Sequence, residues 1–493
     1  MARFPLSLPP GVFRDGTQFQ SKGRYYDAWG VRWYGAAIGP VNGWRRKGSG
    51  VVAGAARAAL AWKANDAKTW LGIGTHNKLF VSDRAGVLSD ITPVGLVAGR
   101  ADAIAAGGYG TGTYGTSTYG TPRPDTSLVQ DATQWTLDSW GEYLLGVSPD
   151  DRKLYQWQLN TGVKAAQVAN SPSCSAVVAT AERFVFALGT SDPRTVSWCD
   201  QENNTAWAPS STNQAGSFPL QTTGRLMCGR RVKGLTLLFT DLDVHAAQYI
   251  GGTLVYGFDK VGDSCGVISR QAAASFGTGE AAWMSPTLNF WLWNGGSVVP
   301  LACEVLDYIR QDINLLQISK TVATVNSANF EIEWRYCSSS SSEIDRCVVW
   351  QYKDNYWNIG RPARTCGVDK GVFQYPILIA NDGKIYDHEL GWDYGGVAPF
   401  ITAGPLELGN GDNIMQVLGL YPDDGTVGDV AVSFTVRRNA DDDGSTFGPY
   451  ALTQKTDLRF AGGQVEMTVT GAASANWRFG IPKLEVAQGE ARG

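Results

Sequence analysis

Histidine, a common residue in acid–base and metal chemistry, is rare in this sequence of 493 residues. The chain contains three histidines, His76, His245 and His388. Histidine is a frequent general base and metal ligand at neutral pH. The three lie far apart, and the sequence contains neither of the patterns HExxH and GxxxxGK(S/T). We therefore predict structural roles for the histidines, no catalytic residues, no cofactor and no enzymatic activity.

Eight cysteines provide a second possible source of metal or redox chemistry. They are Cys174, Cys199, Cys228, Cys265, Cys303, Cys337, Cys347 and Cys366. No pair has the CxxC spacing of structural zinc sites. The N-terminal residues lack the apolar segment of a signal peptide, so we predict synthesis in the cytoplasm and mostly buried, free thiols. A disulfide between Cys337 and Cys347 across a hairpin remains open.

One acidic stretch has the spacing of a known structural motif. Residues 442–447 read Asp-Asp-Gly-Ser-Thr-Phe, which resembles the Asp box of sialidase-type propellers. Ala440 stands where that box has Ser or Thr, and Phe447 stands where it has Trp. The stretch occurs once, and the arginine cluster and tyrosine nucleophile of a sialidase are not assignable from the sequence. We interpret it as a solvated hairpin tip.

The net charge argues against a general nucleic-acid-binding protein. Lys and Arg total 42 and Asp and Glu total 46, which gives a formal net charge of −4. Nucleic-acid-binding domains carry a basic excess or a basic face. The one basic cluster, Arg45–Lys47, follows Trp44 and is interpreted as a solvated turn, with Trp44 in the core.

Composition favours an all-β fold. Glycine accounts for 59 residues and aromatic side chains for 11% of the chain, whereas charged side chains reach only 18%. Glycine weakens helices, aromatic residues favour strands, and disordered chains are poor in aromatics and rich in charge. No run of about 20 apolar residues occurs, so we predict no membrane span.

Seven pairs of apolar runs joined by polar turns predict the main architecture. They occupy residues 69–81, 143–157, 183–198, 235–250, 282–295, 346–357 and 376–387. The first run of each pair is apolar on both faces, as expected of an inner strand in a closed array. Most spacings are about 40–70 residues, near those of known propeller repeats. We predict a β-propeller of about seven blades over residues 51–398, with a pair of β-sandwiches as the alternative.

The segments that flank the propeller have a different pattern. Residues 1–50 are rich in Gly, Pro and aromatic residues and are predicted to be extended, contacting or closing the propeller. In residues 399–493, apolar and polar residues alternate, which predicts an antiparallel β-sandwich domain. Residues 304–314 carry apolar side chains at helical spacing and predict a short helix.

Residues 109–121 repeat Tyr-Gly-Thr every five residues and contain no apolar core residue. Such a stretch predicts an exposed loop inserted within a blade. Tyrosine and glycine together suit an adaptable contact surface. We therefore predict that Tyr109, Tyr114 and Tyr119 contact another subunit or a partner.

Three blocks of the sequence together resemble the tail hub or nozzle proteins of short-tailed bacteriophages, also called packaged-DNA stabilisation proteins. The first block comprises residues 10–17, 23–33 and 43–44. The second is the Tyr-Gly-Thr repeat with residues 135–142. The third comprises residues 312–314, Lys320, Asn326, 331–336 and 382–389.

The resemblance implies a structural virion protein with a β-propeller and an added β domain. It implies a homo-oligomeric ring, usually of six subunits, that extends the portal and adaptor channel of the tail. Such a ring retains packaged DNA, serves as its exit path without sequence-specific binding, and contacts adaptor and fibre or needle proteins. The alternative function is a carbohydrate-binding or sialidase-like propeller that acts as a receptor-binding module.

Overall fold

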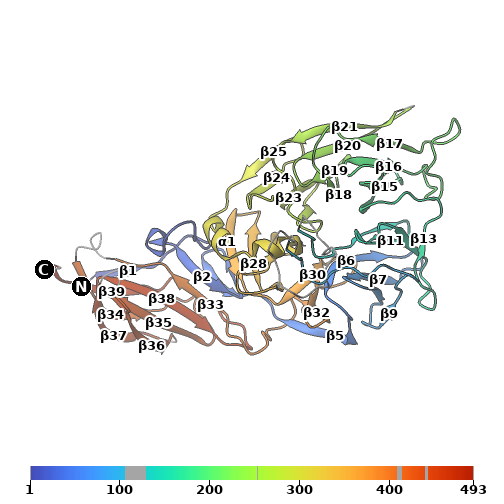
Figure 1. Cartoon of the computed structure of the whole chain (residues 1–493). Helices are drawn as coiled ribbons and strands as arrows, with labels where there is room; N and C mark the ends of the chain where they lie inside the picture. The colour runs from blue at the N-terminus through green and yellow to red at the C-terminus, as the bar shows by residue number, and fades with distance from the viewer. Residues whose placement is uncertain are drawn as a thin grey trace, which may run out of the picture.

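The computed structural model describes residues 2–105, 129–252, 254–407, 413–438, 442–452 and 454–491. Two bodies are visible in Figure 1. A ring of sheets forms one, and a smaller pair of sheets beside it contains both termini of the chain. The all-β fold class is therefore confirmed.

Seven four-stranded antiparallel sheets, here numbered blades 1 to 7, form the larger body in the described residues. Blade 1 consists of β6 (Ala56–Lys63), β7 (Thr69–Thr75), β8 (Leu79–Ser82) and β9 (Leu88–Asp90). Blade 2 consists of β10 (Thr136–Trp140), β11 (Tyr143–Val147), β12 (Leu154–Trp157) and β13 (Ala166–Gln167). Blade 3 consists of β14 (Ala176–Ala179), β15 (Val185–Leu188), β16 (Thr195–Trp198) and β17 (Gly216–Pro219). Blade 4 consists of β18 (Leu226–Val232), β19 (Leu235–Thr240), β20 (Val244–Gly251) and β21 (Val255–Gly262). Blade 5 consists of β22 (Ala273–Phe276), β23 (Glu280–Met284), β24 (Phe290–Trp293) and β25 (Val298–Leu301). Blade 6 consists of β26 (Val322–Asn326), β27 (Glu331–Tyr336), β28 (Arg346–Gln351) and β29 (Tyr356–Gly360). Blade 7 combines β30 (Arg364–Val368), β31 (Ile377–Ala380) and β32 (Lys384–His388) with β5 (Trp44–Val51).

The first strands of the blades contact one another in a closed cycle. β6 lies against β10, and the contacts continue through β14, β18, β22 and β26 to β30, which lies against β6. This cycle is a β-propeller, and the alternative of two β-sandwiches is excluded for these sheets. β5 enters blade 7 from the N-terminal part of the chain, so the ring is closed by strands from its two ends.

The predicted hairpins are present, and their first runs are inner strands, with a paired strand on each side. In six hairpins the first run is the second strand of its blade, and in the hairpin at 346–357 it is the third. Second strands such as β15 are buried throughout, whereas first strands such as β10 and β26 are buried only in part. The physical reason is that second strands are covered by adjacent blades on both faces, while first strands border the axis.

Tryptophans fill much of the space between blades. Trp135, Trp283 and Trp334 are fully buried. Their indole N–H groups donate to the backbone carbonyls of Thr75, Cys265 and Ala272 at 2.7, 2.6 and 3.0 Å. Buried indoles need such partners, and these bonds join each tryptophan to another part of the ring.

Connections outside the sheets include one short helix. The predicted helix is present as α1 (Leu306–Asp312), followed by the 3₁₀ helix η2 (Leu315–Lys320) between blades 5 and 6. Residues 91–135 connect β9 to β10 and contain the Tyr-Gly-Thr repeat. The repeat thus belongs to the connection between blades 1 and 2, and the prediction that it is inserted within a blade is wrong.

The smaller body, here called the β domain, consists of two antiparallel sheets. One contains β1 (Ala2–Pro5), β39 (Lys483–Ala491), β34 (Asn413–Tyr421) and β37 (Thr456–Gly462). The other contains β2 (Tyr25–Trp29), β33 (Phe400–Ala403), β38 (Gln464–Gly471), β35 (Val430–Arg437) and β36 (Ser445–Ala451). Along β35 buried and half-buried residues alternate, as the sequence pattern predicts. β1 and β2 show that residues before 50 also supply strands to this domain.

Residues 2–51, here called the N-terminal arm, run through both bodies. The arm supplies β1 and β2 to the β domain and β5 to blade 7, with the 3₁₀ helix η1 (Gln18–Ser21) and the hairpin of β3 (Val31–Tyr34) and β4 (Ala37–Pro40) between them. Figure 1 shows this blue segment passing between the two bodies. The arm therefore links them by strand pairing at both ends.

A buried charge network fixes the middle of the arm. Arg32 of β3 is 6% exposed, with Nε 2.6 Å from Oε1 of Glu331 and Nη2 2.8 Å from Oε1 of Glu389. Asn326 Nδ2 donates to both carboxylates at 3.3 and 2.8 Å. Burial raises the pKa of Glu331, against the opposing effect of Arg32. We call these four side chains the Arg32 network.

Candidate functional site

The tyrosines predicted to make contacts, Tyr109, Tyr114 and Tyr119, lie outside the described residues. The structure does describe the chain on either side of them. Ile104 and Gln130 form an antiparallel bridge, with N–H···O distances of 2.9 and 3.0 Å. The contact role of the three tyrosines therefore stays a prediction.

The two sides of this connection are held against η2. The Ala103 N–H donates to Gln317 Oε1 at 3.0 Å, and Gln317 Nε2 returns a bond to the Ala103 carbonyl at 3.1 Å. The Ala132 N–H donates to Ser319 Oγ at 3.1 Å. Because one connection joins blades 1 and 2 and the other joins blades 5 and 6, these bonds cross the axis of the propeller.

The three histidines are dispersed. His76 Nδ1 accepts from the Ala55 N–H at 3.0 Å, His245 Nε2 lies 3.1 Å from an oxygen of Asp243, and His388 Nε2 accepts from Arg364 at 3.0 Å. Burial is the largest cause of a lowered pKa at each ring. Each ring thus has a hydrogen-bond or ion-pair partner within the described residues.

The other candidate motifs do not build a centre either. The eight cysteines are free, and seven of them are buried. Among the described residues, no group of three or more His, Cys, Asp or Glu side chains has the arrangement of a metal site. Asp442–Gly444 lie between the paired strands β35 and β36 of the β domain, and Phe447 stacks on Phe460 at 5.0 Å.

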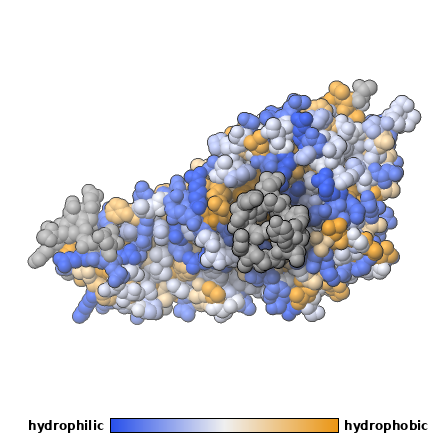
Figure 2. Space-filling view, viewed as in Figure 1, coloured by the Kyte–Doolittle hydropathy of each residue, from blue (hydrophilic) through white to orange (hydrophobic). Residues whose placement is uncertain are grey.

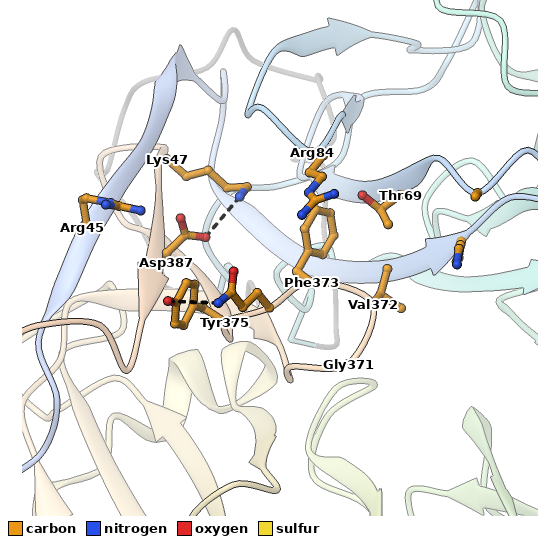
Figure 3. A pocket seen from close by; sticks show the side chains of 12 residues that line it. Arg45, Lys47, Thr69, Arg84, Gly371, Val372, Phe373, Tyr375 and Asp387 are labelled. Carbon is orange, nitrogen blue, oxygen red and sulfur yellow. Dashed lines mark hydrogen bonds and ion pairs between the residues drawn. The ribbon is translucent and has the colours of Figure 1, made fainter.

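A basic pocket lies between blades 7 and 1, and we call it the seam pocket (Figure 3). Arg45 and Lys47 come from β5, Lys63 ends β6, and Arg84 lies in the turn between β8 and β9. The connection from β30 to β31 contributes residues 371–375. The pocket has a volume of about 540 Å³ and opens to solvent.

One carboxylate enters this pocket. Lys47 Nζ lies 3.2 Å from Asp387 Oδ1, and both side chains are largely buried. The same ammonium group lies 5.2 Å from the centre of the Phe373 ring. Gln374 Nε2 donates to the Tyr375 hydroxyl at 3.2 Å. Figure 3 shows the Lys47 and Asp387 side chains pointing toward each other.

The remaining cations give the pocket a positive charge. Asp387 neutralises Lys47, whereas Arg45, Lys63 and Arg84 are exposed and form no ion pair with the described residues. Exposed charges interact weakly in water, but several cations around one concave surface attract a multivalent anion. The seam pocket is therefore suited to phosphate groups or to a cluster of carboxylates, with an affinity that falls with salt.

The sequence reading missed this pocket because its cations come from three separate segments. Arg45–Lys47 lies in the strand β5, so its interpretation as a solvated turn is wrong. Side chains alternate along a strand, which puts Arg45 and Lys47 on the opposite face from Arg46. The alternation of side chains could be predicted from the sequence. The closeness of Lys63 and Arg84 to this strand could not.

None of the helices in the described part of the chain is long and apolar enough to cross a membrane. No family model and no curated protein matches the chain. Among solved structures, streptogramin B lyase is 9% identical with a TM-score of 0.39, and the match covers 70% of this chain and 96% of that one. An inactive variant of virginiamycin B lyase from Staphylococcus aureus, with quinupristin, is 6% identical with a TM-score of 0.42 and coverages of 70% and 98%. The N-terminal domain of Nup159 is 9% identical with a TM-score of 0.37 and coverages of 70% and 95%. The likeness concerns the β-propeller fold alone.

Proposed function

We propose that this protein is a non-enzymatic structural component of a bacteriophage virion, a tail hub or nozzle subunit that assembles into a ring. The observation that carries the proposal is the composition of the Arg32 network. Arg32 belongs to the first block that resembles such tail proteins, and Asn326, Glu331 and Glu389 belong to the third. Residues quoted for the resemblance thus meet in one buried cluster that joins the arm to the propeller.

This arrangement suits a rigid building block. Strand pairing holds the arm at both bodies, and the Arg32 network fixes the arm between them. A ring that retains DNA under load requires subunits whose two bodies keep a fixed relation. Breaking a buried ion pair is costly, so the network resists separation of the bodies.

Two described elements are suited to contacts between subunits. The hairpin of β20 and β21 extends beyond β19, and Ile250 and Leu254 near its tip are 53% and 70% exposed. Figure 2 shows apolar surface beside this tip. The seam pocket is the second element, since a chain of net charge −4 offers carboxylates that its cations attract.

The DNA path in this proposal is the channel of the ring, between subunits. Bonds between η2 and the connection of blades 1 and 2 cross the axis of each propeller, so a single propeller offers no open passage there. The net negative charge of the chain suits a channel lining, because carboxylates repel phosphates and let DNA slide.

The direct test is the assembly state of the purified chain, alone and co-expressed with the other tail proteins of its genomic neighbourhood. We expect closed rings with a central channel in negative-stain images and a matching mass by light scattering. A chain that stays monomeric in every mixture would contradict the proposal. Binding on a glycan array by such a monomer would instead support the receptor-binding alternative.

A further inference from the structure

A second cavity, separate from the seam pocket, lies where blades 6 and 7 meet the N-terminal arm. Its volume is about 400 Å³, within the range of small-molecule sites. The Arg32 network forms part of its wall, and Val325, Leu378 and Val397 are among the apolar residues that line it. We call it the arm cavity.

Three of the four arginines in the arm cavity are paired with carboxylates. Arg32 binds Glu331 and Glu389, as described above. Arg335 Nε lies 3.0 Å from an oxygen of Glu333. Arg361 Nη2 lies 2.8 Å from an oxygen of Asp27. Each of these three arginines therefore has at least one carboxylate partner within the protein, and Arg32 has two.

Arg364, at the start of β30, is the exception. Its residue is 9% exposed, and it forms no ion pair with a carboxylate among the described residues. Its Nε donates to His388 Nε2 at 3.0 Å and its Nη1 to the Ala363 carbonyl at 3.2 Å. Within the described part of the chain, Nη2 has no hydrogen-bond partner. One edge of the guanidinium thus remains free to bind a ligand.

Aromatic rings hold this guanidinium in place. Its central carbon lies 5.2 Å from the centre of the Trp44 ring and 4.4 Å from that of Tyr386. Trp44 also stacks on His388, with ring centres 5.4 Å apart. Stacking leaves the edge of a guanidinium free, and that edge matches the two oxygens of a carboxylate.

Among the described residues, Arg364 contacts no carboxylate, and its hydrogen-bonded neighbour His388 supplies no negative charge. Burial and the nearby arginines hold the pKa of His388 well below its usual range, so the ring is neutral at pH 7. Burial lowers the pKa of Arg364 to about 10, which still leaves it charged at pH 7. A buried charge without a partner is unfavourable, and an anion in the cavity would relieve that cost.

A second unpartnered group lines the same cavity. The Tyr394 side chain is 1% exposed, and its hydroxyl has no hydrogen-bond partner in the described residues. Burial raises the pKa of Tyr394, so the hydroxyl stays protonated and able to donate. The arm cavity therefore contains one free cationic edge and one free neutral donor.

We propose that the arm cavity binds a small organic monocarboxylate, with Arg364 as the residue that binds its carboxylate. One free guanidinium edge matches a single carboxylate better than phosphate or a dicarboxylate. The apolar walls favour an organic body, and the Tyr394 hydroxyl offers a further donor. This site is independent of the proposed ring, because all its residues come from one chain.

The test adds benzoate to the protein, with benzamide as the uncharged control. The positions of the histidine ring signals are followed by NMR in protein labelled in those rings. The chain has only three histidines, so three ring signals are expected. Benzoate should shift the His388 signal in a saturable way, because His388 is bonded to Arg364, and leave those of His76 and His245 unchanged. No saturable shift of His388, or an equal response to benzamide, would overturn the proposal.

A variant pair assigns the charge. Arg364→Gln should weaken benzoate about ten- to a hundredfold, the range of a lost hydrogen bond to a charged group. Arg361→Gln removes a paired arginine that lines the same cavity and should change the affinity less than twofold. Equal losses in the two variants would overturn the assignment to Arg364. The histidine shifts of the unmodified chain decide the question even if Arg364→Gln fails to fold.

Discussion

The Arg32 network offers the sharpest test of how the arm is held. Replacing Arg32 by methionine keeps an unbranched side chain but removes the charge. Glu331 and Glu389, whose side chains are 11% and 15% exposed, then keep only the Asn326 amide as a donor within the described residues. Removing one partner of a buried ion pair costs about 3–5 kcal/mol, and we expect a loss in this range at pH 8.

The loss should depend on pH in a defined direction. Without Arg32, burial and repulsion by Glu389 raise the folded-state pKa of Glu331 further above the unfolded-state value. A group with a raised folded-state pKa supports folding while it is protonated, and that support is lost as the pH rises through the folded-state pKa. The deficit of Arg32→Met should therefore be largest at pH 8 and smaller near pH 5.

Native-state hydrogen exchange measures the opening free energy of β3 and β4 directly, without requiring two-state unfolding of the whole chain. The control is Arg361→Met, because the Arg361 side chain is 43% exposed and its ion pair with Asp27 should contribute less than about 1 kcal/mol. A loss below about 1 kcal/mol for Arg32→Met at pH 8, or an equal loss at pH 5 and pH 8, would refute this reasoning.

Three further changes probe the seam pocket, the Tyr-Gly-Thr repeat and the core. The double variant Lys63→Glu and Arg84→Glu should weaken tripolyphosphate binding to the seam pocket several-fold in low-salt calorimetry, since exposed charges contribute about 0.2–1 kcal/mol each. Lys68 lies outside the pocket, so a similar loss with Lys68→Glu would show that the seam pocket is not the binding site. Deleting residues 109–121 should leave the melting temperature unchanged, because bonds to η2 hold both flanks, but should abolish ring assembly; unchanged rings would remove the contact role. Trp283→Ala should lower the free energy of unfolding by about 3–5 kcal/mol in denaturant titrations, because it empties a fully buried site and removes the hydrogen bond to the Cys265 carbonyl. A loss near zero would contradict the burial of Trp283 between blades.

Local pattern sufficed for the elements that depend on near neighbours. The paired apolar runs predicted the hairpins, because each hairpin is closed by a short turn and buries side chains of its own strands. The spacing of four apolar residues predicted α1. Of these, Val305, Ile309 and Ile313 are buried and Tyr308 is half-buried. The same runs did not show which strand borders the axis, since burial on two faces depends on adjacent blades.

The candidate sites depended on contacts between distant residues. Arg32 and Glu331 are 299 positions apart, and no local signal pairs them. The seam pocket depends on the pairing of β5 with β32, which places Arg45 opposite Asp387. Tyr109, Tyr114 and Tyr119 lie outside the described residues, so their predicted contact role is untested by the structure.

The sequence by itself determined that the chain is all-β, built from hairpins and poor in histidine. Those properties follow from composition and from periodicity over a few residues. Only the tertiary structure decided that one N-terminal arm joins both bodies and that Arg32 of this arm pairs with Glu331 of blade 6 and with Glu389. It also decided that Arg364 contacts no carboxylate among the described residues. Charge balance in a folded protein is set by which distant side chains share a cavity, and sequence order does not contain that information.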